Sequence, residues 1–412
     1  MAAAVAEAHR TEWAFVLAAT IRVTRDLNTA EDCVQDAYAK ALAAWSTQEI
    51  PSKPGAWLTT VARRRAFDLA DKSDDARRAL PLLVTDHVAA GPEWAEGEEI
   101  EDDRLRLIFT CCHPALAPEA QVALALRLLC GLGTPEVARA FLVSESTMAA
   151  RITRAKKKIA AARIPYRVPP LAELPDRTES VLAVVHLLFT TGHAAPAGAD
   201  LVRRDLVERA LDLARMLRSL LPGDPEVASL LALILLTDAR RRTRVSDEGH
   251  LLLLADQDRS QWDRSEIDEG LRLVAQAIRK GRPRRFALMA AITAVHADSP
   301  SWDATDWEEL VGLYDLLLDA WPSPVVALNR AVAVGFAAGP AAGLAALGPL
   351  ESEPQLTTYG YLASARADLL RRLGRIPEAL VSYEEALAFT ENDVERSFLA
   401  QRIADLKSPG AS

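Results

Sequence analysis

The chain has 412 residues and a formal net charge of −9, with half of its residues hydrophobic and a quarter charged. This length allows two or three domains, and the balance is typical of a soluble protein. There is no apolar run long enough for a membrane span and no signal peptide, so we expect a cytoplasmic protein without membrane contact. Four cysteines lack the spacing of a disulfide framework or a zinc site. We therefore expect small buried thiols, no metal and no cofactor; the thiols are Cys33, Cys111, Cys112 and Cys130.

Charge is segregated along the chain. Between Arg139 and Arg163 there are seven basic residues and a single acid, Glu145, whereas Glu93–Asp103 holds seven acids and no base. Local clusters of cations, rather than the net charge, decide whether a protein contacts nucleic acid. The anionic total therefore does not exclude DNA binding.

The composition favours an all-α fold, because Ala, Leu and Arg are abundant and strands with alternating hydrophobicity are absent. Breaks in composition divide the chain into four parts. They are a first helical module at 10–72, an acidic linker at 73–103, a second helical module at 104–164 and, after a proline-rich boundary, a long helical extension at 176–407.

The first module is predicted to hold three helices. The first spans 12–26, and the second starts at Thr29 as N-cap, with an apolar stripe facing inward. Its opposite face carries Asp32, Gln35, Asp36 and Lys40. The third spans 55–71 and is expected to turn Trp57, Leu58, Val61 and Phe67 inward and to carry Arg63, Arg64 and Arg65. Spacing alone favours a solvated surface for the polar face and for the arginines.

The second module has sharper helix boundaries. Ala117-Pro118-Glu119 and Thr134-Pro135-Glu136 each open a helix with proline in the first turn. After a short turn, a last helix begins with Ser144 or Ser146 as its cap. Its inward stripe is Met148, Ile152, Ala155 and Ile159, and another face carries Arg151, Arg154 and Lys158.

A short helix, a short turn and a longer basic helix form a helix-turn-helix. Such a helix fits the major groove, with its N-terminal residues at base edges and its cations on phosphates. Ser144, Ser146 and Thr147 stand at that N-terminal end. On this evidence DNA binding is favoured, and a solvated basic helix is the alternative.

These motifs, in this order, resemble the extracytoplasmic-function (ECF) class of RNA polymerase sigma factors. The stretch 29–37 (TAEDCVQDA) resembles the class's polymerase-docking helix, 56–65 (AWLTTVARRR) its −10 helix, and 133–139 (GTPEVAR) with 144–158 its −35 region. The segments 108–114, 256–262 and 323–331 resemble a subgroup with a tetratricopeptide-like extension.

The resemblance implies roles for particular residues and two partners, core RNA polymerase and promoter DNA. Asp32, Gln35 and Asp36 would contact the polymerase clamp, and the loop at about 47–54 would trap a flipped base of the −10 strand. Arg63, Arg64 and Arg65 would hold the backbone of that strand, although many members carry Asn where Arg64 stands. The helix from Ser144 would read the −35 element, with Arg151, Arg154 and Lys158 on its phosphates.

The extension resembles helical repeats. Residues 361–387 match one tetratricopeptide repeat with Gly374 at the turn, and 327–347 form a weaker copy with Gly339 at the turn. Stacked helix pairs offer a concave surface that suits a regulatory protein or peptide. The mixed-charge segment 240–258 is either a local salt-bridge network or a contact that positions the extension. The resemblance implies that the extension regulates activity.

Three other classes of function compete with this interpretation. No metalloprotease, P-loop, dinucleotide or nucleophile-elbow motif is present, so we expect no catalytic residues. A helix-turn-helix regulator that binds duplex DNA without polymerase would need no clamp-docking helix. A tetratricopeptide scaffold would not need the basic helix.

Overall fold

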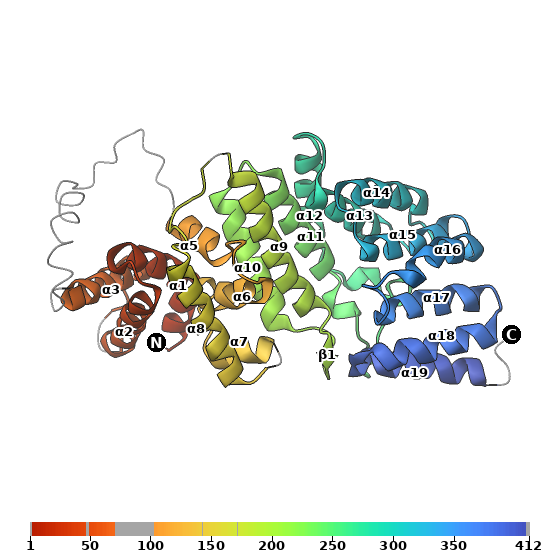
Figure 1. The fold of residues 1–412 in the computed structure, drawn as a ribbon, viewed down its shortest axis with the longest axis horizontal. Helices are drawn as coiled ribbons and strands as arrows, with labels where there is room; N and C mark the ends of the chain where they lie inside the picture. Colours follow the sequence, from red (N-terminus) through yellow and green to blue (C-terminus); the bar gives the residue numbers. More distant parts are fainter. Residues whose placement is uncertain (1, 47–48, 71–102, 142, 171, 409–412) are drawn as a thin grey trace. The chain divides into compact units, whose positions relative to one another are not determined.

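The computed structural model describes residues 2–46, 49–70, 103–141, 143–170 and 172–408. The chain divides into two compact units, Met1–Val184 and Val185–Ser412, and each is described by itself. The described part is all-α, as predicted, apart from one pair of two-residue strands (Figure 1). None of its helices is both long enough and apolar enough to cross a membrane. Except for Asp103, the predicted linker at 73–103 lies outside the described residues.

The first three helices pack on one another. They are α1 (Ala2–Thr24), α2 (Leu27–Ala44) and α3 (Pro54–Ala70), and α1 contacts both of the others. The first helix begins ten residues earlier than predicted because its alanine-rich start buries Val5 and Ala8. The predicted cap Thr29 was wrong, because Asp26 precedes α2 and its carboxylate accepts from the Thr29 amide at 2.7 Å. The prediction of an inward Phe67 was also wrong, since its side chain is exposed.

The next helices follow the predicted boundaries closely. Ser144 is the N-cap of the last one, and its hydroxyl accepts from the Thr147 amide at 3.2 Å. Met148, Ile152, Ala155 and Ile159 are buried, as predicted. The cysteines are buried free thiols, and burial raises the pKa of Cys112 to about 12, which keeps that thiol protonated. The elements are α5 (Asp103–Cys111), α6 (Pro118–Leu124), a π-helical turn η1 (Ala125–Leu129), α7 (Thr134–Ala140) and α8 (Glu145–Ala161).

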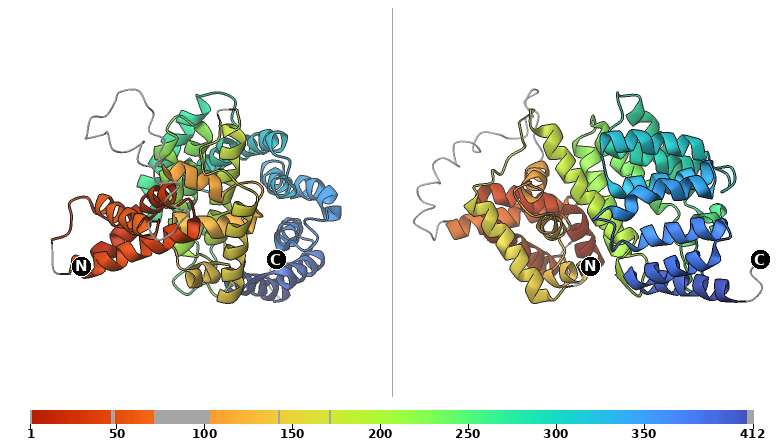
Figure 2. Two further views of the ribbon diagram at one scale, coloured as in Figure 1. Left: turned by 60° about the vertical axis from the view of Figure 1, so that its left-hand side comes forward. Right: turned by 45° about the vertical axis from the view of Figure 1, so that its right-hand side comes forward.

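The extension is a succession of helices. From α10 onward, neighbouring helices pack in sequence, and the blue helices in Figure 2 lie side by side. The predicted helix pairs at 327–347 and 361–387 are confirmed, with positive φ angles of 95° at Gly339 and 75° at Gly374 in the turns. The helices are α9 (Leu174–His193), α10 (Arg204–Leu220), α11 (Pro225–Asp238), α12 (Arg264–Ile278), α13 (Arg285–Asp298), α14 (Trp307–Ala320), α15 (Pro324–Ala337), α16 (Pro340–Leu347), α17 (Gly360–Arg372), α18 (Ile376–Phe389) and α19 (Asp393–Lys407).

Short elements connect these helices. The turns between α11 and α12 contain η2 (Arg241–Thr243), η3 (Leu254–Asp256) and η4 (Arg259–Gln261), and η5 (Gly348–Ser352) follows α16. Strand β1 (Ala197–Gly198) pairs in parallel with β2 (Glu391–Asn392), so the beginning of the second unit is joined to its end. Asn392 is fully buried there, and its amide nitrogen donates to the carbonyls of Ala195 and Asp200 at 3.1 and 2.9 Å.

Candidate nucleic-acid interface

The outer face of α2 is polar and accessible. Asp32, Gln35 and Asp36 are all exposed, because the apolar stripe of the helix faces α1 and α3. Asp36 forms an ion pair with Arg65 of α3 at 2.9 Å, and both side chains are more than a third exposed. Such an exposed pair adds little stability. The pair does bring one predicted polymerase-contacting residue together with one predicted DNA-contacting residue.

The three arginines of α3 differ in their surroundings. Arg64 is exposed and Arg65 is held by Asp36. Arg63 is half-buried, and its Nε has no hydrogen-bond partner among the described residues. Burial and the nearby Arg22 guanidinium lower the pKa of Arg63, while Asp103 partly offsets them. Arg64 therefore has the freest guanidinium of the three.

Helix α8 presents its N-terminus and one basic face to solvent. Ser144, Ser146 and Thr147 are exposed, and the Ser144 hydroxyl lies 3.1 Å from that of Ser146 and 2.8 Å from that of Thr147. Arg154 and Lys158 are exposed as well. Arg151 is half-buried, with its guanidinium 5.3 Å from the centre of the Phe141 ring. The arrangement leaves polar groups at a helix N-terminus and cations behind them, as major-groove recognition requires.

Glu31 joins the two modules, and the sequence analysis did not single it out. This carboxylate is buried on α2, where it forms an ion pair with Arg127 of η1 at 2.9 Å and another with Lys156 of α8. The Lys156 ammonium also donates to Asn28 at 2.9 Å. A clue was present in the sequence, because Glu31 stands three residues before Val34 and seven before Tyr38, on the apolar stripe of its helix.

Further contacts hold the two modules against each other within the first unit. The indole nitrogen of Trp13 donates to the Leu128 carbonyl at 3.1 Å, and the hydroxyl of Tyr166 donates to the Ala18 carbonyl at 3.1 Å. Arg22 forms an ion pair with Asp103 at 3.3 Å. Together with Glu31, these contacts make the two modules one packed body.

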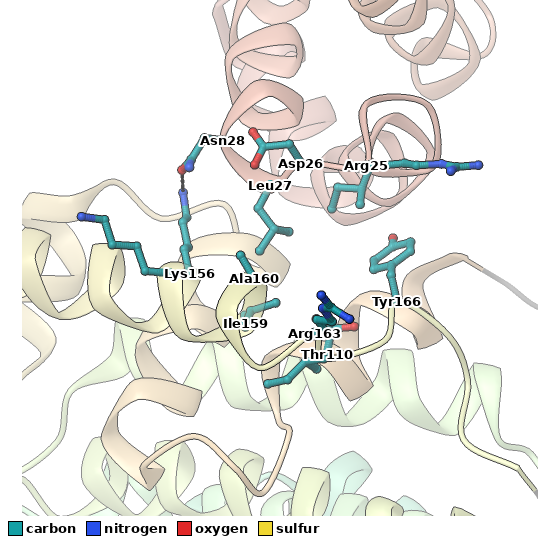
Figure 3. A pocket seen from close by; sticks show the side chains of 13 residues that line it. Arg25, Asp26, Leu27, Asn28, Thr110, Lys156, Ile159, Ala160, Arg163 and Tyr166 are labelled. Atoms are coloured by element: carbon teal, nitrogen blue, oxygen red, sulfur yellow. Dashed lines mark hydrogen bonds between the residues drawn. The ribbon is translucent and has the colours of Figure 1, made fainter. Parts of the chain in front are cut away.

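A surface pocket of about 810 Å³ lies beside this contact, between the α1–α2 connection and the end of α8 (Figure 3). Four cations line it and Asp26 is the acid among the lining residues; the cations are Arg25, Lys156, Lys157 and Arg163. Arg25 and Arg163 have positive φ angles of 53° and 49°, an uncommon conformation for a side chain of their size. The pocket can attract an anion, but Lys156 is already bound by Glu31 and Asn28.

The potential metal-ligating side chains of the described ranges are dispersed. No group of three His, Cys, Asp or Glu side chains there could hold a metal ion. His113, next to the cysteine pair, instead accepts from the Ala115 amide at 3.1 Å through Nδ1.

Comparison with known proteins matches the same parts of the chain. Residues 12–75 match the family Sigma-70 region 2, and residues 106–159 match Sigma-70, region 4. Residues 177–278 match a family of unknown function, DUF6596. An uncharacterized protein of Rhizobium meliloti (strain 1021) is 39% identical over 401 residues, which is 96% of this chain and 94% of that protein.

Two more distant matches are partial. A protein of Mycobacterium tuberculosis described as a probable ECF RNA polymerase sigma factor, SigI, is 29% identical over 171 residues, which cover 40% of this chain and 58% of that protein. A crystal structure of a thermophilic TPR protein of Thermus thermophilus covers 55% of this chain and 96% of that chain, with a TM-score of 0.37 and 17% identity.

Regions 2 and 4 together define the sigma-70 class of transcription factors, which are not enzymes. The chain therefore carries sigma-70 regions 2 and 4 and is similar to an ECF sigma factor over part of its length. It belongs to one family with the uncharacterized R. meliloti protein, which matches it along nearly its whole length, the helical extension included.

Proposed function

We propose that the chain binds core RNA polymerase and directs it to promoters with −10 and −35 elements, and that its extension regulates this activity. In this proposal residues 10–72 act as region 2, with Asp32, Gln35 and Asp36 on the polymerase clamp. Arg63, Arg64 and Arg65 act on the −10 strand. Residues 104–164 act as region 4, with Ser144, Ser146, Thr147, Arg151, Arg154 and Lys158 at the −35 element.

The observation that carries the proposal is the solvent-exposed start of α8 with its cations. Ser144 caps the helix, but packing and capping give no role to the exposed Arg154 and Lys158 on one face. Phosphate contacts through such cations supply much of the affinity for DNA and fix the register, and the N-terminal groups at base edges supply the sequence specificity. The exposed acids of α2 repel DNA and suit a protein partner.

We infer that the two modules separate when the protein engages a promoter. The two elements are about 25 base pairs apart, which is about 85 Å along B-DNA. Modules that touch through Glu31, Trp13 and Tyr166 cannot reach both elements at once. The packed pair is then the resting form, and Lys156 is withheld from DNA by its contact with Glu31.

Run-off transcription with core polymerase tests the main proposal. Full-length protein should support transcription from a subset of a promoter library, and Ala at positions 32, 35 and 36 together should abolish binding to core polymerase. Ala at the exposed Lys40, on the same helix, is the matched control. A triple variant that still acts on the promoter would indicate a helix-turn-helix regulator that works without polymerase.

Deletion of the extension tests its regulatory role. Removal of residues 176–412 should change the amount of transcript without changing which promoters are used, because promoter recognition is assigned to the first two modules. Unchanged output would argue that the extension serves another purpose, such as scaffolding.

Fluorescence energy transfer tests module separation. The four natural cysteines are buried, so dyes can be placed on Lys40→Cys in α2 and on Ala162→Cys directly after α8, both exposed positions. The distance between the dyes should lengthen when polymerase and promoter are added. A distance that stays constant in a transcribing complex would refute the inference.

A further inference from the structure

A cluster of basic side chains lies inside the second unit and includes none of the residues that the proposed function uses. Arg240 and Arg244 follow α11, and Arg259 belongs to the same connection before α12. His193 ends α9 and His296 lies near the end of α13. Arg244 is buried and the other four are partly buried, so the cluster is recessed but accessible to solvent.

Two of these arginines are fixed by neutral partners rather than by carboxylates. Arg244 donates through Nη1 to the carbonyl of His193. Arg259 donates through Nη1 to the carbonyls of His296 and Ser299 at 2.6 and 2.7 Å, and its guanidinium lies 4.6 Å from the centre of the Trp262 ring. Carbonyls and a ring orient the guanidinium groups, but they do not cancel the positive charges.

The acids near the cluster act on Arg244 rather than on Arg240. The charges of Glu395 and Asp238 raise the pKa of Arg244 against the effect of burial, so its positive charge is partly offset. Asp238 forms an ion pair at 3.3 Å with Arg241, the residue that follows Arg240 in the chain. Glu395 accepts from the hydroxyl of Tyr361 at 2.5 Å. Within the described ranges, the Arg240 side chain makes no ion pair with a carboxylate and no hydrogen bond. The cluster thus carries an excess of positive charge at Arg240.

The pKa shifts of the cluster agree with this arrangement of positive charges. Burial and the charges of Arg244 and Arg259 lower the pKa of Arg240 to about 10. Burial and the charges of Arg240 and Arg259 lower the pKa of His296 to about 4, and the pKa of His193 is also lowered by burial and by Arg244 and Arg240. Both histidines are therefore neutral at pH 7, while the arginines stay charged and repel one another.

Several nitrogens in the cluster lack hydrogen-bond partners. Nη2 of Arg259, Nδ1 of His193 and Nδ1 of His296 are buried and unpartnered in the described part of the chain. A buried polar group without a partner is costly, and uncompensated buried cations are more so. Guanidinium groups match the oxygens of phosphate and carboxylate in geometry as well as charge.

We propose that Arg240, Arg244 and Arg259 form a binding site for an oxyanion, the phosphate or carboxylate group of a small molecule. Arg240 is its principal contact, since that guanidinium makes no ion pair and no hydrogen bond within the described ranges. Trp262 and the carbonyls of His296 and Ser299 keep Arg259 in place beside it. The site stands on the geometry of the extension alone and does not depend on the proposed role in transcription.

Titration calorimetry on the full-length chain, without polymerase or DNA, tests the site. Inorganic phosphate and citrate are the two probes, and sodium chloride at matched ionic strength is the reference. At least one probe should bind and raise the melting temperature of the chain above the chloride reference. Binding of phosphate but not citrate would identify a phosphate site, and the reverse a carboxylate site. No binding of either would overturn the proposal.

Two substitutions separate specific binding from general attraction of anions. Arg240→Gln should weaken binding by about tenfold or more, because it removes a charge-assisted contact. Arg242→Gln, at an exposed arginine two residues away in the same connection, should leave binding unchanged. Equal affinity in Arg240→Gln and wild type, or equal loss in both variants, would overturn the assignment.

The anion-free protein provides a second test, which a damaged fold could not imitate. Removal of the Arg240 charge relieves the repulsion from Arg244 and Arg259, so Arg240→Gln should melt at a higher temperature than wild type at low ionic strength. Added phosphate should then narrow or reverse that difference, because it stabilises wild type alone. An Arg240→Gln variant that melts lower under both conditions would show Arg240 to be a structural residue.

Discussion

The charged groups of α8 and those of the 240–259 connection have the same chemistry and opposite settings. Arg154 and Lys158 lie on an exposed helix face, where long phosphate-bearing polymers can approach. Arg240, Arg244 and Arg259 are at least partly buried, and carbonyls and a ring orient Arg244 and Arg259. Exposure therefore separates cations suited to DNA from cations suited to a small ligand. Glu31 belongs with the recessed set, because this buried carboxylate compensates the charges of the partly buried Lys156 and Arg127.

The largest expected effect is at the buried carboxylate of Glu31. Glu31→Gln leaves Arg127 and Lys156 without a countercharge in a buried contact, so it should lower the free energy of unfolding by about 3 kcal/mol. Urea denaturation of the full-length chain measures this. Asp32→Asn, at the exposed neighbouring position, should change it by less than about 0.5 kcal/mol. Similar effects in both variants would remove the distinction between recessed and exposed charges.

The next effect concerns a recessed histidine of the second unit. Burial and Arg285 lower the pKa of His186 to about 4, from an ordinary value near 6.5. His186 therefore binds a proton more readily in the unfolded chain than in the folded one. The free energy of unfolding is highest above pH 6.5 and decreases as the pH falls from 6.5 towards 4. The loss should reach about 3 kcal/mol for this group.

Unfolding free energies measured between pH 7 and pH 4 check the sign and the source. His186→Phe should make the pH dependence less steep by the share of one group, because His193 and His296 still contribute, and substitution of the exposed His250 by Gln should leave it unchanged. An unchanged slope in His186→Phe would assign the pH dependence to other groups.

The exposed cations of α8 should affect DNA binding and not stability. Arg154→Ala should make the salt dependence of promoter affinity less steep by about one phosphate contact, because one fewer counterion is released. Filter binding or fluorescence anisotropy of the complex with polymerase at several salt concentrations measures the slope. Unchanged slope and affinity would place Arg154 outside the DNA contact.

The smallest expected effect is at the cap of α8. Ser144→Ala removes the hydroxyl that accepts from the Thr147 amide, which should cost about 1 kcal/mol of stability. Ser146→Ala should cost less, because Ser146 does not cap the helix. A larger loss in Ser146→Ala would reverse the assignment of the cap.

The features that the sequence predicted well are those encoded by local periodicity. The stripe from Met148 to Ile159, the cap at Ser144 and the helix pairs with Gly339 and Gly374 at their turns all follow from spacing and turn chemistry. The candidate residues of α2 and α8 could be placed on exposed faces for the same reason. The family resemblance supplied their proposed partners.

The features that the sequence did not predict depend on contacts between distant segments. Glu31 meets a residue 96 positions later and another 125 positions later, and nothing near Glu31 specifies that pairing. The environment of Arg63 depends in the same way on Arg22 and Asp103, from other helices. The recess around Arg240 is assembled from α9, the α11–α12 connection and α13, so a run of arginines in the sequence could not distinguish it from a salt-bridge network.

The pairing of β1 with β2 makes the second unit a closed structure rather than an open stack. In an open helical array the terminal repeat can be removed and the remainder still folds, because each repeat contacts only its neighbours. Here the buried amide of Asn392 satisfies carbonyls at the opposite end of the unit, nearly two hundred positions earlier in the chain. Trimming only the last helices would therefore expose the first ones, and the unit should unfold as a whole instead of fraying from one end.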